Sequence, residues 1–132
     1  MLRFVIPGAL ILAAACAANA ALPQRGGDRS EEAKIAKQLA GMTPGKPQDC
    51  LPRDRYNGME GYSSTILFIG GPKKIWRNEL IGACTGLSRD DLPVITSPSG
   101  RMCRGDRVET RSRIGGMMTS ACALGSFVPY SK

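Results

Sequence analysis

The sequence contains no histidine among its 132 residues. Histidine is the usual general base near neutral pH, a frequent metal ligand and the common pH switch. Its absence excludes the Ser-His and Cys-His arrangements that activate many catalytic nucleophiles. No two cysteines form a C-x-x-C motif, which argues against a zinc knuckle or a thioredoxin-like redox pair. We therefore expect a protein that is not an enzyme and that holds no metal and no cofactor.

Aromatic residues are also scarce, at 5% of the chain, whereas glycine and proline are frequent, with 16 and 9 copies. Glycine and proline interrupt regular elements and mark turns. This composition favours short strands joined by turns over a bundle of long helices. A chain of this length has room for one domain and a leader.

Residues 1–20 have the features of a secretory signal peptide. Arg3 supplies the positive start, an apolar segment follows from Phe4 to Ala15, and Ala18-Asn19-Ala20 is an A-x-A cleavage site. The apolar segment, about a dozen residues, is shorter than the roughly 20 residues that a bilayer-spanning helix needs. We expect cleavage before Ala21 and a periplasmic or secreted product.

A second route of export stays open. The segment from Leu12 to Cys16 resembles the signal of bacterial lipoproteins, although Ala13 stands where leucine is usual. On this route Cys16 would be lipidated and would anchor the protein to a membrane. On either route four cysteines remain, and an even number in a short exported chain predicts two disulfides. They are Cys50, Cys84, Cys103 and Cys122.

Four cysteines allow three pairings, among which the sequence alone does not decide. The order of the predicted strands favours one of them. Cys84 and Cys103 flank a loop rich in turn residues, and closure of a barrel would bring Cys50 near Cys122. We therefore predict the disulfides Cys84–Cys103 and Cys50–Cys122.

The chain divides into a leader at 1–20, a tether at 21–48 and a β domain at 49–132. The tether mixes proline, glycine and charged residues, and within it a short helix is predicted near 31–40. Ile35 and Leu39 are the large apolar residues of that helix and form a narrow stripe on it. We expect the helix to lie on the domain or in the tether.

The fold class predicted for the β domain is mainly β: a small antiparallel barrel or rolled sheet, disulfide-stapled, with one N-terminal helix. Apolar runs and alternating segments are separated by turn residues, which indicates five to six strands. Two disulfides, at about 2–4 kcal/mol each, would stabilise a domain with so small a core. The predicted strands are 65–69, 73–80, 93–96, 106–114, 117–123 and 124–130, the last of them terminated by Pro129. Strands 65–69 and 73–80 are predicted to form a first hairpin, and strands 106–114 and 117–123 a second.

From residue 65 onward the chain resembles a proteobacterial family of small exported four-cysteine proteins of unknown function. The resemblance covers roughly residues 49–130 and implies export and a cystine-bearing β domain. It implies no activity, because the family has none to transfer. The matching segments are Thr65-Ile-Leu-Phe68, Trp76-Arg-Asn-Glu-Leu80, Cys84 with Gly86-Leu87, Cys103-Arg-Gly-Asp106 and Cys122-Ala-Leu-Gly-Ser-Phe-Val-Pro129.

The candidate binding site is a basic strand. The chain has a formal net charge of +7, and loss of Arg3 with the leader would leave +6. Alternation along 106–114 places several arginines on one side of a strand, and the arginine fork suits phosphate and carboxylate groups. The candidate anion-binding residues are Arg101, Arg104, Arg107, Arg111 and Arg113.

We therefore expect an exported protein that binds an anionic envelope lipid or glycan. Nucleic acid is not expected as a partner, because no aromatic residues interleave the arginines. A solvated charged face without a ligand is the simpler alternative for the arginines. An exported inhibitor or protein-partner-binding β module is the alternative function, and the sequence gives no information on the oligomeric state.

Overall fold

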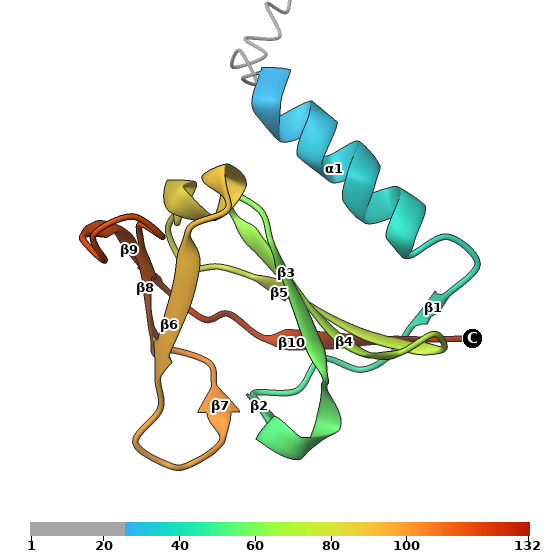
Figure 1. The fold of residues 1–132 in the computed structure, drawn as a ribbon. Coiled ribbons are helices and arrows are strands. Elements are labelled where there is room, and N and C mark those ends of the chain that lie inside the picture. Colours follow the sequence, from blue (N-terminus) through green and yellow to red (C-terminus); the bar gives the residue numbers. More distant parts are fainter. Residues whose placement is uncertain (1–25) are drawn as a thin grey trace, which may run out of the picture.

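The structure is a computed structural model, and it describes residues 26–132. The predicted signal peptide at 1–20, the lipidation site Cys16 and the start of the tether lie outside the described residues. Over this range the chain forms one α-helix, α1 (Gly26–Gln38), which precedes the strands described below. Figure 1 shows α1 on one side of a twisted sheet, with the remaining strands on the other side.

The larger sheet has five antiparallel strands in the order β1-β10-β5-β4-β3. Its centre is the predicted first hairpin, in which Phe68 of β4 pairs with Trp76 of β5. The C-terminal strand β10 is inserted between β5 and β1. The bounds are β1 (Thr43–Pro44), β3 (Gly58–Gly61), β4 (Thr65–Gly71), β5 (Lys74–Glu79) and β10 (Phe127–Ser131).

Two smaller sheets complete the fold. A three-stranded sheet has the order β6-β8-β9 and contains the predicted second hairpin, and a two-stranded sheet pairs β2 with β7. Two 3-10 helices, η1 and η2, connect these parts. The bounds are β2 (Cys50–Leu51), η1 (Arg53–Arg55), η2 (Thr85–Arg89), β6 (Leu92–Thr96), β7 (Met102–Cys103), β8 (Arg107–Arg111) and β9 (Met118–Ala123).

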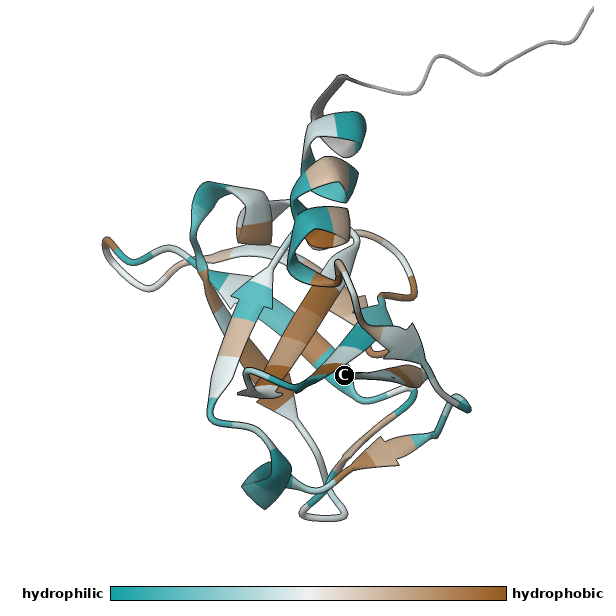
Figure 2. Cartoon of the chain, turned by 90° about the vertical axis from the view of Figure 1, so that its right-hand side faces the viewer, coloured by the Kyte–Doolittle hydropathy of each residue, from teal (hydrophilic) through white to brown (hydrophobic). Residues whose placement is uncertain are grey.

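The apolar run of β4 is explained by burial on both of its faces. Ile66 and Phe68 point into the main core between the sheets, whereas Leu67 points to the other side, against α1. A strand covered on both faces needs no polar alternation. In Figure 2 the hydrophobic residues accordingly gather on strands inside the fold, while the outer side of α1 is hydrophilic.

Ile35 of α1 and Leu39, just after its end, are buried, with 1% and 8% of their surface exposed. They pack on the five-stranded sheet with Leu67, Ile75 and Tyr62. The helix begins at Gly26, earlier than the predicted 31–40, and the following strand β1 pairs with β10. Much of the segment predicted as a tether therefore packs on the β domain, because its two large apolar residues suffice to anchor it.

The prediction of a mainly β, antiparallel, disulfide-stapled fold with one N-terminal helix is confirmed. The strands outnumber the expected five to six, because short pairs such as β2 and β7 carry no periodicity in two residues. The sheets roll without closing into a barrel: β3 and β6 each end a sheet within the described residues. No helix of the described part of the chain is long and apolar enough to cross a membrane.

The predicted disulfide pairing is wrong. Cys50 is bonded to Cys103, with 4.0 Å between their Cα atoms, and Cys84 is bonded to Cys122, with 5.6 Å. The first pair forms because β2 lies directly beside β7. The second forms because Ile81, just after β5, bridges to β9 and brings Cys84 to that strand.

The prediction that Pro129 ends the last strand is also wrong. Pro129 lies inside β10, opposite Trp76. Its carbonyl accepts a hydrogen bond from the Gly45 backbone at 2.6 Å, so its backbone groups face β1. The missing N–H therefore costs no bond to β5, which is the condition under which a strand tolerates proline.

Candidate binding surface

The outer face of the three-stranded sheet carries the central part of the predicted arginine site. Arg107 and Arg111 project from this face of β8, with 61% and 45% of their side chains exposed. Glu109 lies between them on the same face, and its two carboxylate oxygens are 2.8 Å and 2.9 Å from the two guanidinium groups. The row therefore holds two cations and one anion.

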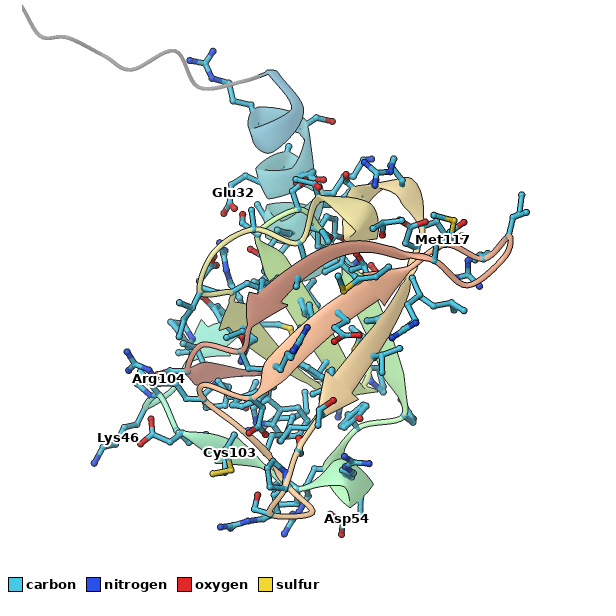
Figure 3. The ribbon with its side chains drawn as sticks, turned by 90° about the vertical axis from the view of Figure 1, so that its left-hand side faces the viewer. Glu32, Lys46, Asp54, Cys103, Arg104 and Met117 are labelled. Atoms are coloured by element: carbon cyan, nitrogen blue, oxygen red, sulfur yellow. A yellow bond between two sulfur atoms is a disulfide. The ribbon has the colours of Figure 1, made fainter. Side chains whose placement is uncertain are left out.

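The other three predicted arginines do not join this row. Arg113 lies beyond the end of β8, where its Nε donates to the Asp90 carbonyl at 2.6 Å and lies 3.2 Å from the Asp90 carboxylate. Arg101 and Arg104 flank β7. Figure 3 shows Arg104 at the opposite end of the sheet from Met117 in the β8–β9 turn. The five arginines thus occupy two separated regions.

Exposed apolar side chains accompany Arg107 and Arg111, a feature that the sequence analysis missed. Leu92 and Val94 of β6 are 43% and 41% exposed and pair with Arg111 and Glu109. Met118 of β9 is 54% exposed and pairs with Arg111 from the other side. We call this set the docking face; its members are Leu92, Val94, Arg107, Glu109, Arg111 and Met118.

The turn between β8 and β9, residues 112–117, is called the tip. Ile114 and Met117 in it are 90% and 74% exposed. Most of the exposed large apolar side chains among the described residues therefore lie on the docking face or the tip. Figure 3 shows that the tip projects from the body of the fold. Contiguous exposed apolar groups of this kind mark interaction sites in soluble proteins.

Backbone hydrogen bonds hold the tip in one shape. The Ser112 N–H donates to Met117 O at 2.9 Å, and the Gly116 N–H donates to Ser112 O at 3.2 Å. Arg111 donates to Gly116 O at 3.3 Å. Gly115 and Gly116 have φ angles of +81° and +68°, which side-chain-bearing residues rarely adopt. Ile114 and Met117 are thus displayed on an ordered turn.

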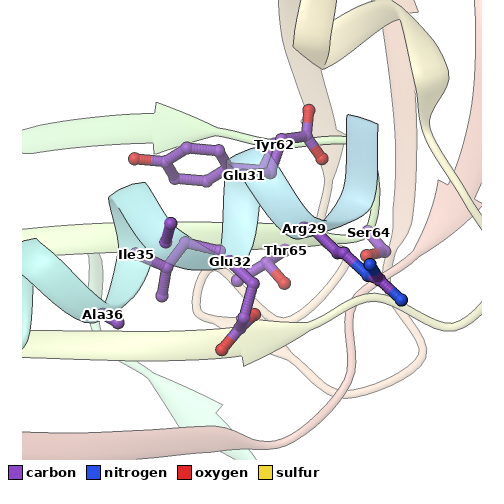
Figure 4. A pocket seen from close by; sticks show the side chains of 9 residues that line it. Arg29, Glu31, Glu32, Ile35, Ala36, Tyr62, Ser64 and Thr65 are labelled. Atoms are coloured by element: carbon purple, nitrogen blue, oxygen red, sulfur yellow. The ribbon is translucent and has the colours of Figure 1, made fainter. Parts of the chain in front are cut away.

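A cavity of about 450 Å³ lies between the first turns of α1 and the β3–β4 turn. Figure 4 shows Glu31, Glu32, Tyr62 and Thr65 around it. These side chains bind protein groups: Glu31 accepts from the backbone and hydroxyl of Ser63, each at 3.1 Å. The polar groups of this cavity therefore clamp the helix to the sheet.

Arg77 completes that clamp. It donates two hydrogen bonds of 3.0 Å to the Glu32 carboxylate and a further one to Glu79. Burial lowers the pKa of Arg77, but the hydrogen bonds to the two carboxylates outweigh that effect and raise it above its ordinary value. The Thr65 hydroxyl donates to Glu79 at 3.0 Å. These four side chains bind one another, so we interpret them as a structural contact between the helix and the sheet.

A smaller cavity, of about 270 Å³, lies between the edge strands β3 and β6. Its charged groups are three carboxylates, of Glu60, Asp90 and Asp91, and Arg113, which binds Asp90. Tyr62 lies beside it and donates to Glu60 at 3.2 Å. Burial raises the pKa of Tyr62 above its ordinary value, and the negative charge of Glu60 raises it further.

Serine and threonine side chains form a hydrogen-bonded chain near η2. A chain of hydroxyls links Gly86 N–H to Ser120, Ser120 to Thr110, and Thr110 to Thr119, which donates to Asp91 at 2.7 Å. This chain joins η2 to β8 and β9. Within residues 26–132, no group of three or more Asp, Glu, Cys or His side chains is placed to hold a metal ion.

No family model matches the chain, and neither does any curated protein or any solved structure. The residues themselves are therefore the basis for assigning a function.

Proposed function

We propose that this chain is an exported, non-enzymatic binding protein of the bacterial envelope. Its docking face binds an anionic surface, made of lipid headgroups or acidic glycans. One observation carries the proposal: the cationic row of β8 and most of the exposed large apolar side chains occupy the same sheet and its turn. A purely solvated charged face would not need the apolar flanks.

The ion pairs of the docking face do not prevent binding. Arg107 and Arg111 share the single carboxylate of Glu109, so the row keeps one positive charge. The two guanidinium groups are exposed and have further N–H donors, so they can bind a phosphate or carboxylate of the partner while they stay paired with Glu109, whose side chain is only 16% exposed. The net charge that remains without the leader, +6, attracts the protein to anionic surfaces from a distance.

Export is supported by the covalent structure and by the sequence. Two disulfides are typical of proteins that fold in an oxidising compartment. The leader-like residues 1–20 agree with this, and so does the resemblance to small exported four-cysteine proteins. Whether the product is free in the periplasm, secreted or anchored through Cys16 depends on how the leader is processed.

The second candidate is a protein-partner-binding module, such as an exported inhibitor. The open edges of β3 and β6 support it, because an unpaired strand edge can accept a strand from another chain. Methionine and arginine, both present on the docking face, are also enriched in protein interfaces. We rank it second because the cavity between these edges is acidic and narrow, whereas the docking face is broad and exposed.

Vesicle co-sedimentation tests the first proposal. The protein is recovered from the periplasm of an expression host, and its mass defines its N-terminus. We expect binding to vesicles of equal parts phosphatidylglycerol and phosphatidylcholine that weakens about tenfold as salt rises toward 0.5 M, because salt screens exposed charges. Replacing Arg107, Arg111 and Arg113 by glutamine should remove most of the binding.

A matched control removes the same number of charges elsewhere. Lys34, Arg53 and Arg55 are exposed and lie on α1 and η1, away from the docking face. Their replacement by glutamine should leave most of the vesicle binding intact. Equal losses of vesicle binding in the two triple variants would show that only net charge matters, and would overturn the proposal that the docking face is the binding surface. Binding to an acidic polysaccharide but not to vesicles would assign the surface to glycans.

A further inference from the structure

The tip has the chemistry of a membrane-inserting loop. Ile114 and Met117 are 90% and 74% exposed, and Met118 next to them is 54% exposed. Hydrogen bonds from Ser112, Gly116 and Arg111 nevertheless fix the turn. A turn that is ordered without burying its apolar side chains presents them ready for another apolar phase.

Arginines stand directly behind these apolar groups. Arg111 ends β8 and donates to the carbonyl of Gly116 in the turn, and Arg113 lies within the turn and donates to Asp90. Ile114 is three residues beyond Arg111, so its side chain reaches at most roughly 10 Å past it, at about 3.3 Å per residue. This upper limit is compatible with the 5–10 Å or so by which interfacial segments enter the headgroup and acyl boundary.

We propose that the tip inserts into an anionic phospholipid bilayer, with Ile114 and Met117 among the acyl chains and Arg111 and Arg113 at the headgroup phosphates. The inference rests on the proposed binding of an anionic surface and selects lipid as its source. A glycan offers nothing apolar for Ile114 and Met117 to enter. A bilayer offers binding partners to both kinds of side chain, because its acyl chains, which accept the apolar side chains, lie directly beneath the phosphates that bind the arginines.

Asp90 faces the same region and must be considered with the arginines. The Asp90 side chain is 86% exposed. The guanidinium group of Arg113 binds both the backbone carbonyl and the carboxylate of Asp90. The pair is neutral and lies on the flank of the tip, where η2 ends. Arg111 shares the single carboxylate of Glu109 with Arg107, so that row keeps a positive charge, and we expect Arg111 to contribute more to lipid binding than Arg113.

Tryptophan fluorescence tests insertion directly. The chain has one tryptophan, Trp76, which is 7% exposed and serves as a constant background. In an Ile114→Trp variant we expect a blue shift on addition of the phosphatidylglycerol vesicles and quenching by brominated acyl chains. An Ile81→Trp variant is the matched control, since Ile81 is 50% exposed but lies outside the tip and docking face. It should show neither effect.

A second measurement tests the energetic role of the tip. Replacing Met117 by serine should weaken partition into these vesicles by about tenfold, the loss expected for one buried apolar side chain. Ile81→Ser is again the control and should leave partition unchanged. Pure phosphatidylcholine vesicles should give little binding with any variant, because the choline cation of each headgroup balances its phosphate and the surface has no net negative charge to attract the arginines.

The outcomes separate this inference from the proposed function. Salt-sensitive vesicle binding without an emission shift in the Ile114→Trp variant would overturn insertion and leave the anionic-surface proposal standing. Absence of vesicle binding by the unaltered protein would overturn insertion, and absence of binding to an acidic polysaccharide as well would overturn both proposals. A blue shift that grows with protein concentration in the absence of vesicles would assign the tip to contact between copies of the chain, and would equally overturn insertion.

Discussion

The side chain of Asn78 is hydrogen-bonded twice to the backbone of Gly125. Its Nδ2 donates to Gly125 O and its Oδ1 accepts from Gly125 N, each at 2.8 Å. Asn78 is fully buried on β5, at the last residue pair between β5 and β10. A Cβ at position 125 would collide with the Glu79 carbonyl, so only glycine lets the two segments approach this closely. The side-chain amide of Asn78 thus continues the hydrogen bonding between β5 and the β10 segment beyond the last backbone pair.

We expect Asn78→Ala to lower the free energy of unfolding by about 2–4 kcal/mol. The substitution leaves the buried N–H and carbonyl of Gly125 without partners, and each such group costs about 1–3 kcal/mol. Urea denaturation measures the loss. Asn57→Ala is the control, because Asn57 is exposed, and its effect should stay within about 0.5 kcal/mol. A loss in N78A no larger than in the control would contradict the role of the amide.

The two disulfides should not be equivalent. They close loops of 53 and 38 residues, for which chain entropy predicts nearly the same stabilisation, about 4 kcal/mol. The folded state distinguishes them: Cys84 is fully buried in the main core, whereas Cys50 and Cys103 are half-buried. Replacing Cys84 and Cys122 by alanine should therefore destabilise the protein more, by a further 1 kcal/mol or so from the cavity.

Thermal and urea unfolding of the two double-alanine variants decide this ranking, since both lack one cross-link. The reverse order, with the greater loss in the variant without Cys50–Cys103, would show that unfolded-state structure outweighs core packing. Peptide mapping without reduction checks the pairing itself and should recover Cys50 with Cys103.

Deprotonation of Tyr62 should lower the free energy of unfolding at alkaline pH. Burial raises its pKa above the ordinary value of about 10, and the charge of Glu60 adds to this. The unfolded chain then loses the phenolic proton at a lower pH than the folded chain. The contribution of Tyr62 is constant below about pH 10 and is lost progressively as the pH rises further. Stability measured in urea across that range should decline less in a Tyr62→Phe variant.

Replacing Ile35, which anchors α1 to the sheet, should lower the free energy of unfolding without weakening vesicle binding. Ile35 is 1% exposed between the helix and the five-stranded sheet, and Ile35→Ala should cost about 2–4 kcal/mol. Lys37→Ala, at an exposed position of the same helix, should be nearly neutral. Because α1 lies on the other sheet, vesicle binding at temperatures below the unfolding transition should be the same in both variants. A selective loss of binding in I35A would place α1 in the binding surface.

The elements with local signals are predictable from the sequence. The apolar run 65–69, the glycines that follow it and the alternation around Trp76 predict the β4–β5 hairpin, which the structure contains. The segment 106–114 likewise predicts β8 and its turn into β9. In each case the partners are neighbours in the chain, so the turn residues fix their pairing.

Long-range contacts are not predictable in the same way. The pairing of Cys50 with Cys103 depends on two strands of two residues each, which leave no periodic pattern. The helix starts earlier than predicted because the local start signal, Ser30 followed by Glu31 and Glu32, does not end it there, and it extends back to Gly26. The prediction of a strand end at Pro129 fails because the sequence does not show which side of the strand faces β1.

The binding surface is predictable in part. Alternation places Arg107 and Arg111 on one side of β8, and the structure agrees, but Glu109 shares that side and neutralises part of its charge. Continued alternation would place Ile114 on the buried side of the strand. It is exposed instead, because β8 ends at Arg111 and the alternation stops there. The Gly115-Gly116 pair is the available signal that the chain turns there and exposes its apolar neighbours.

The two disulfides cross along the chain, since Cys84 lies between Cys50 and Cys103, and Cys103 lies between Cys84 and Cys122. A protease that cut a single peptide bond anywhere between residues 50 and 122 would therefore leave both fragments covalently joined. The exposed tip, a natural site for such a cut, falls within the span of Cys84–Cys122. A molecule nicked there would keep its two halves together, whereas cleavage before Cys50 would release a peptide that carries α1 with it.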